Sequence, residues 1–162
     1  MGKNLRKDFI MLALIAGSVA AAVRTVVSAV PFALGVTKNI APVVLAEIIL
    51  QMKEMPLKFS YLLLGEFAHV LFGGILAVGL GLVYVKWGTD FYLIKGAVYG
   101  LSSWLICKVI LCPLIIPGPP EPLNLATAVV SLTSHVIYGL LAGYIIVKYG
   151  DLFGDSAGKT KA

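Results

Sequence analysis

Residues 56–73 read PLKFSYLLLGEFAHVLFG, and residues 122–139 read PLNLATAVVSLTSHVIYG. The two segments align without a gap on a Pro-Leu start and on a His-Val-(Leu/Ile)-(Phe/Tyr)-Gly end. Each then continues to a Val-Lys-aromatic-Gly ending, at 85–88 and at 147–150. These shared features indicate that one segment occurs twice in the chain.

The composition predicts that most of the chain lies in lipid. Of its 162 residues, 59% are hydrophobic and only 13% are charged, whereas soluble domains carry roughly 25% charged residues. The net charge is +5, but the basic residues lie at the ends of apolar stretches, which is the pattern of membrane orientation. We therefore expect the lipid bilayer as a partner and no nucleic acid.

Four segments are long enough to cross a bilayer, which takes about 20 mostly apolar residues. The first of them continues past Arg24, which makes it longer than the apolar region of a signal peptide, so we expect it to be retained as a span. The predicted fold is an all-α integral membrane protein with four transmembrane helices in a single domain over residues 1–162. The four spans are 9–35, 57–85, 92–116 and 123–147.

A shorter apolar segment, 42–55, lies between the first two spans. Glu47, Gln51 and Glu54 recur in it at helical spacing. At this length a helix cannot cross the bilayer. We expect it to lie in the outer interface or to re-enter the membrane slightly. The second outer connection, 117–122, is rich in proline and cannot be helical.

The distribution of Lys and Arg predicts the orientation. With four spans both termini lie on one side, and that side carries basic residues at both ends of the chain and in the connection 86–95. The opposite side carries Lys38, Lys53 and Lys58 in one connection and no basic residue in the other. The positive-inside rule therefore predicts cytoplasmic termini and a cytoplasmic tail at 151–162. We expect the membrane to be the plasma membrane.

The repeated segment predicts a duplicated helix pair. The first unit covers 9–88 and the second covers 92–150. The first and third spans match more weakly, although each carries a basic residue near its middle, Arg24 and Lys108. Because the two units insert in the same direction, the repeat is expected to be parallel, related by an axis along the membrane normal.

Five ionisable residues lie inside the predicted spans, where such groups are costly and are functional candidates by default. Counting inward from the outer helix ends at 1.5 Å per residue places them within about 6 Å of one depth, near the middle of the bilayer. We expect them to form one polar layer that binds a ligand. They are Arg24, Glu66, His69, Lys108 and His135.

The pairing within this layer can be argued from charge. Glu66 and His69 are three residues apart and share a helix face, and Glu66 is the expected partner of Arg24, which cannot lose its proton. Lys108 has no carboxylate at its depth, which leaves an uncharged amine or a bound anion as alternatives. A purely structural layer, with the histidines hydrogen-bonded to serines of other helices, stays open as well.

Cys107 and Cys112 both lie in the third span. In a regular α-helix a spacing of five places two residues about 140° apart, and the spacing matches no zinc motif. We therefore expect two packing residues and no disulfide between them.

Three functions remain as hypotheses. The first is an oligomeric transporter or channel for a small ion or polar solute, since a polar site at the midplane of a parallel repeat is typical of transporters. The second is a haem b protein with His69 and His135 as axial ligands. The third is a non-catalytic structural or accessory subunit. An enzyme is the least supported, because the sequence offers no clear nucleophile-base pair.

Overall fold

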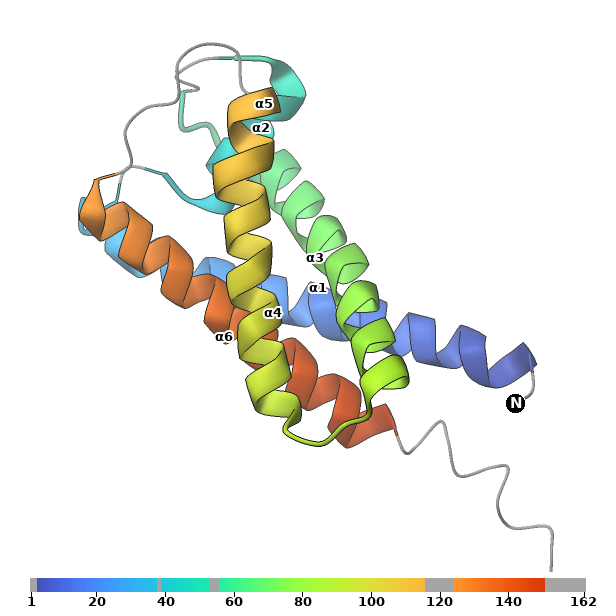
Figure 1. The fold of residues 1–162 in the computed structure, drawn as a ribbon. Helices are drawn as coiled ribbons and strands as arrows, with labels where there is room; N and C mark the ends of the chain where they lie inside the picture. The colour runs from blue at the N-terminus through green and yellow to red at the C-terminus, as the bar shows by residue number, and fades with distance from the viewer. Residues whose placement is uncertain (1–2, 38, 53–55, 116–123, 151–162) are drawn as a thin grey trace, which may run out of the picture.

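The computed structural model describes residues 3–37, 39–52, 56–115 and 124–150, and in these ranges the protein is helical without any strand. The predicted tail at 151–162 lies outside the described residues, as does the proline-rich connection 117–122. The helices are α1 (Lys3–Ala33), α2 (Ala41–Leu50), α3 (Phe59–Trp87), α4 (Tyr92–Trp104), the π-helical segment η1 (Leu105–Leu111), α5 (Cys112–Ile115) and α6 (Leu125–Gly150) (Figure 1).

Four helical stretches are long and apolar enough to cross a membrane, which confirms the predicted all-α membrane architecture. Their bounds differ by only a few residues from those expected, because hydropathy marks the apolar core of a helix better than its ends. These four candidate spans fit an integral membrane protein. The stretches are Phe9–Ala33, Phe59–Trp87, Tyr92–Ile115 and Leu125–Gly150.

The short helix between the first two spans is shorter than the predicted 42–55. Helix α2 ends at Leu50 because Gln51 takes a left-handed conformation with a φ of 52°. Its backbone N–H then donates to carbonyl oxygens of the last helical turn, which closes the helix. Gln51 therefore leaves the predicted polar stripe, and Glu54 lies outside the described residues.

The third span is not one regular α-helix, although the sequence predicted a single helix there. Between α4 and α5 the backbone widens into η1, and the N–H of Cys112 donates to the carbonyl oxygen of Cys107, five residues earlier. This i→i−5 pattern defines a π-helix, a rare conformation that occurs frequently at functional sites.

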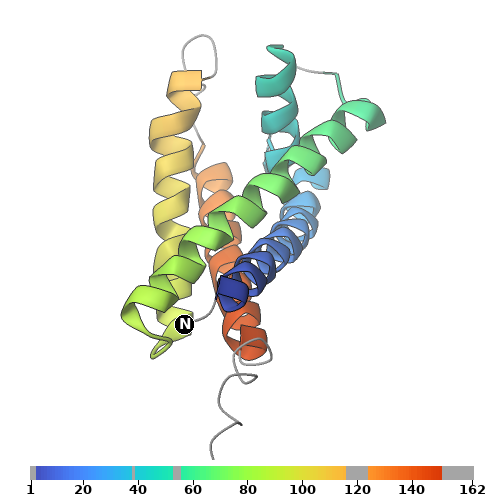
Figure 2. The ribbon, with the colours of Figure 1, turned by 90° about the vertical axis from the view of Figure 1, so that its right-hand side faces the viewer.

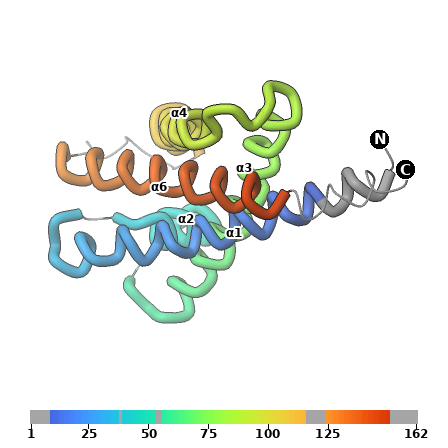
Figure 3. Tube along the Cα trace, turned by 90° about the horizontal axis from the view of Figure 1, so that it is seen from below, coloured from blue at the N-terminus to red at the C-terminus, as the bar shows by residue number. Residues whose placement is uncertain are grey.

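The helices pack as two neighbouring pairs. Helix α1 packs along α3, α4 packs along α6, and α1 also lies beside α6, so the pairs are joined through their first and last spans (Figure 3). Helices α3 and α4 meet at their connection and diverge away from it (Figure 2). We call the end of the bundle with this 88–91 connection the terminus end and the opposite end, where α2 lies, the α2 end.

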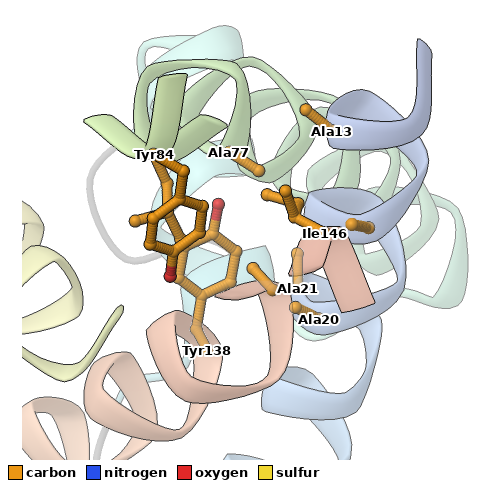
Figure 4. Close-up of a cluster of buried hydrophobic side chains, with 10 residues drawn as sticks. Ala13, Ala20, Ala21, Ala77, Tyr84, Tyr138 and Ile146 are labelled. Carbon is orange, nitrogen blue, oxygen red and sulfur yellow. The ribbon is translucent and has the colours of Figure 1, made fainter. Parts of the chain in front are cut away.

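The core between α1, α3 and α6 consists mainly of small residues and lies towards the terminus end. Alanines from α1 and α3 pack against Tyr84, Tyr138 and Ile146 (Figure 4). The Tyr138 hydroxyl donates to the Gly73 carbonyl oxygen at 2.5 Å, which ties α6 to α3. Small side chains let membrane helices approach closely, so this half of the bundle is closely packed. The α2 end is packed separately, with Val43 and Ala46 of α2 against α3.

Candidate functional site

A cavity of about 100 Å³ lies between the alanine core and α2. Ala21, Gly73 and Tyr138 border it where it meets the core, and residues of α2 border it on another side. Its walls come from α1, α2, α3, α6 and the third span, so every span contributes. The polar residues that line it are Arg24, Ser28, Thr37, Asn39, His69, Cys107, Lys108, Cys112, Thr127, Ser131, Ser134, His135 and Tyr138.

Four of the five residues of the predicted polar layer line this one cavity. Arg24 comes from α1, His69 from α3, Lys108 from η1 and His135 from α6. Glu66 does not line the cavity, and its side chain is 29% exposed. Glu66 and His69 are three residues apart and share a helix face, but only the His69 imidazole reaches the cavity.

Arg24 is held in place by residues of two other helices. Its Nε donates to the Ser134 hydroxyl of α6 at 3.3 Å, and its Nη1 lies 2.9 Å from Nε2 of His69 on α3. An arginine has only donors, so Nε2 of His69 must accept. This contact fixes the tautomer of His69, with the proton on Nδ1.

The hydrogen bonds continue from His69 to Glu66. Nδ1 of His69 lies 3.0 Å from the Thr25 hydroxyl, which donates in turn to Oε2 of Glu66 at 2.9 Å. Nδ1 is also 3.6 Å from the same carboxylate oxygen. We call this series (Arg24, His69, Thr25 and Glu66) the Arg24–Glu66 network. It connects the cavity to a partly exposed carboxylate on α3.

The expected ion pair between Arg24 and Glu66 is absent. The one salt-bridge contact among the described residues joins His69 to Glu66. The Glu66 carboxylate is therefore connected to Arg24 only through the His69 imidazole and the Thr25 hydroxyl. Spacing along a single helix could not predict this, because the intervening Thr25 comes from α1 and Glu66 from α3.

His135 differs from His69 although the two occupy matching positions of the repeated segment. Its Nδ1 lies 2.7 Å from the carbonyl oxygen of Ser131 in its own helix. Since a carbonyl can only accept, His135 also carries its proton on Nδ1. It is 4% exposed, and it lies beside Ser134 in the cavity wall.

Lys108 forms no salt bridge in the part of the chain that the structure describes. It lines the cavity from η1. Arg24 makes the cavity cationic, and a protonated Lys108 would add to its charge, because no Asp or Glu is among the lining residues. In a site of low dielectric constant two such charges attract an anion far more strongly than they would in water.

The two cysteines line the same cavity, which corrects the expectation that they face different directions. That expectation assumed a regular α-helix. In η1 the turn is wider, so positions five apart fall nearly above one another, and Cys107 and Cys112 flank Lys108 on the cavity side. Both are free thiols.

Sequence reasoning also missed Thr25, Ser134 and Thr37. Thr25 and Ser134 are ordinary small polar residues whose roles follow from contacts across helices. Thr37 lies in the connection after α1, is 3% exposed, and its hydroxyl is the one buried side-chain polar atom of the described residues without a hydrogen-bond partner. Leaving such a group unpaired costs about 1–3 kcal/mol, which favours a water molecule or a ligand beside it.

The residues do not fit a haem. Both ring nitrogens of His69 lie against polar partners, and Nε2 faces the Arg24 guanidinium where an iron ion would need a free lone pair. The cavity of about 100 Å³ is also far smaller than the roughly 300–1,000 Å³ of sites for drug-sized ligands. Within the described ranges no group of three or more His, Cys, Asp or Glu side chains is placed to hold a metal ion.

Fold and site together define a class of protein: a small helical membrane protein with a cationic cavity enclosed by its spans. The chain belongs to a family of unknown function (DUF6789), whose family model matches residues 8–151. No curated protein and no solved structure matches it.

Proposed function

We propose that the protein is a homo-oligomeric membrane transporter or channel for small anions. The observation that carries the proposal is the cavity lined by Arg24 and Lys108 with no carboxylate in its wall. Charged groups inside a span are costly, and two cations without a counter-ion in the same cavity are stabilised when an anion binds between them. A purely structural layer would be expected to pair its charges directly.

The Arg24–Glu66 network supports this role. His69 and Thr25 hold the guanidinium in one orientation, while Glu66 stays outside the cavity. Coulomb attraction falls with distance. The Glu66 carboxylate, which does not contact Arg24 directly, therefore offsets part of the cost of burying Arg24, while the guanidinium can still attract a bound anion. Serine and histidine side chains around the cavity supply further polar contacts.

The dimensions of the cavity limit the substrate. A volume of about 100 Å³ holds a few water molecules, each of which occupies about 30 Å³ in the liquid. The cavity therefore suits an inorganic anion or a very small carboxylate rather than an amphiphile or a nucleotide. The alanine core lies between the cavity and the terminus end, and we propose that a substrate enters from the α2 end. With cytoplasmic termini, that end faces the outside.

Anion flux in proteoliposomes tests the proposal. Purified protein is reconstituted, and the release of chloride, nitrate and phosphate is followed with ion-selective electrodes or radiolabels. We expect wild-type protein to release at least one of these anions faster than empty liposomes do. Lys108→Met should slow this release by about tenfold or more, since a charge-assisted contact is worth roughly 1.5–3 kcal/mol. Lys108→Met is the cleaner variant, because Lys108 forms no salt bridge that the substitution would break.

Arg24→Gln is the second variant, and it should lower the flux at least as much. Lys86→Gln is the matched control, because Lys86 is an exposed cation at the terminus end, where it lies over the Trp87 ring. Wild-type flux in Lys108→Met and Arg24→Gln would contradict the proposal, as would wild-type liposomes that release potassium but none of the anions.

A further inference from the structure

The first turn of α2 lies at the cavity. Ile40, which precedes the helix, and Ala41, its first residue, both line the cavity, and so do three further residues along one face of α2. The N-terminus of a helix presents unpaired backbone N–H groups and a partial positive charge, and is a ready-made site for an anion.

This N-terminus has no side-chain cap. Ile40 occupies the N-cap position, where an apolar side chain cannot accept a hydrogen bond from the first turn, and no such bond is formed. Pro42 in the first turn lacks an N–H, but Ala41 and Val43 keep theirs. Serine, threonine, aspartate and asparagine are the usual residues at this position. Because no side chain caps this N-terminus, its N–H donors are available to a ligand in the cavity.

Thr37 is a second observation that indicates a ligand at the N-terminus of α2. It precedes α2 by a few residues, lines the same cavity and is 3% exposed. Its hydroxyl has no hydrogen-bond partner among the described residues. A buried hydroxyl that the protein leaves unpaired is a donor placed for a ligand, and this one lies in the same stretch of the wall as the free N-terminus of α2.

We propose that Thr37 and the N-terminus of α2 form a second anion subsite in the cavity that Arg24 and Lys108 also line. This inference rests on the proposed function and deepens it. The ligand is the same small anion, which meets backbone N–H groups and the Thr37 hydroxyl at one subsite and the two cationic side chains at the other. Helix α2, about 15 Å long at 1.5 Å per residue, acts as a half-helix whose positive end faces the substrate, an arrangement that transporters use for anionic groups.

Anion-dependent thermal stabilisation of the detergent-purified full chain measures the subsite directly. The probe is nitrate, titrated against gluconate at constant ionic strength, and the midpoint gives the apparent Kd. Thr37→Val, which keeps the shape and removes the hydroxyl, should raise the apparent Kd by about three- to tenfold. Thr37→Ser, which keeps the donor, should stay close to wild type. Thr89→Val, in the exposed connection at the terminus end, is the isosteric control.

Two variants at the N-cap position test the role of α2. Ile40→Asp and Ile40→Asn both introduce a good capping group, but only the aspartate brings a negative charge to the subsite. We expect Ile40→Asp to weaken nitrate binding by about tenfold more than Ile40→Asn does. Both substitutions can cap the helix and both remove the packing of Ile40 against Val43 and Ala46, so the two variants should share one denaturation midpoint without nitrate, and a difference between them in nitrate binding is then not an effect of unfolding.

The outcomes distinguish the subsite from the function on which it rests. If Thr37→Val and Ile40→Asp bind nitrate like wild type while Lys108→Met does not, the subsite is wrong and the anion site at Arg24 and Lys108 stands. If wild type and all the variants are insensitive to nitrate, chloride and phosphate alike, the proposed function fails and the subsite fails with it. A loss of binding in Thr37→Ser equal to that in Thr37→Val would also overturn the role of the hydroxyl.

Discussion

At the residue scale, Arg24 shows how a permanently charged side chain is held inside a membrane protein. Its guanidinium contacts Ser134 and His69, and the carboxylate of Glu66 is reached only through Thr25. Because Arg24 and Thr25 lie on α1, His69 and Glu66 on α3, and Ser134 on α6, these contacts also tie three helices together. The same contacts that orient the charge therefore contribute to the packing of the bundle.

Cys107 and Cys112 provide a chemical test of the cavity in the unmodified protein. Both thiols line it beside Lys108. We predict that a membrane-impermeant methanethiosulfonate reagent, added at the α2 end, reduces anion flux through wild type by at least half. The attached group would occupy much of a cavity of about 100 Å³. Excess nitrate should slow the modification, because it competes for the same space.

The double variant Cys107→Ser/Cys112→Ser is the control, since serine differs from cysteine by one atom. It should carry flux but resist the reagent. Equal inhibition of wild type and the double variant would place the reactive group elsewhere and contradict the position of the thiols in the cavity.

At the element scale, the packing of α4 on α6 depends on glycine. A Cβ atom added to Gly139 would lie 2.0 Å from the carbonyl oxygen of Gly96 and 2.9 Å from the backbone nitrogen of Gly100. Real Cβ atoms essentially never approach other heavy atoms this closely, so the backbones of the two helices lie at a distance that only glycine permits. Gly73 makes a similar approach to Gly17 and Ala21 in the other helix pair.

Gly139→Ala should therefore destabilise the protein. The added methyl group meets backbone atoms, which cannot rotate away, and overpacking of this kind costs about 1–3 kcal/mol. We expect the midpoint of thermal denaturation in detergent to fall by several degrees. The control is Gly150→Ala in the same helix, where nothing lies within 4 Å of the added atom. Similar midpoints for the two variants would contradict the close approach of α4 and α6.

These glycine contacts also bear on the proposed duplication. Gly73 and Gly139 occupy matching positions of the repeated segment, and each packs on two small residues four apart in the preceding span. The parallel repeat of 9–88 and 92–150 stays a proposal, supported by these equivalent contacts. The units differ around their histidines, because His69 has Arg24 as a partner whereas His135 bonds within its own helix.

At the scale of the whole molecule, the third span is the least covered by the rest of the protein. In the most apolar window of Tyr92–Ile115 only 11% of the residues are buried, against 33–39% in the other three spans. The exposed side of this span includes Ser102 among its apolar residues, and η1 carries Lys108 nearby. A surface of this kind is suited to a second copy of the chain as well as to lipid.

We therefore predict that the protein is a homo-oligomer that packs through α4 and η1. Native mass spectrometry or light scattering of the detergent complex should give a mass of at least two chains. Val98→Trp, on the exposed side of α4, should shift the protein towards the monomer, whereas Leu63→Trp on α3 should not, although the two residues are similarly exposed at 56% and 53%. A monomeric wild-type protein would contradict this prediction.

The sequence by itself determined the four long apolar helices, and it predicted a common depth for the ionisable residues. Lipid cannot satisfy backbone hydrogen bonds, so an apolar stretch of about 20 residues must become a helix whatever surrounds it. Distance along a helix then places Arg24, His69, Lys108 and His135 at similar depths, and all four line one cavity.

Only the tertiary structure decided how these residues are used. Glu66 shares their depth but lies outside the cavity, because helix rotation is set by packing against neighbouring helices. The π-helical turn that brings Cys107 and Cys112 to one side is a departure from regular helix spacing that no periodicity marks. Thr37 is a common residue in a connection, and its burial without a partner exists only once α2 folds back beside the spans. The predicted depth of a residue depends on its position along one helix, whereas each of these features depends on contacts among several helices.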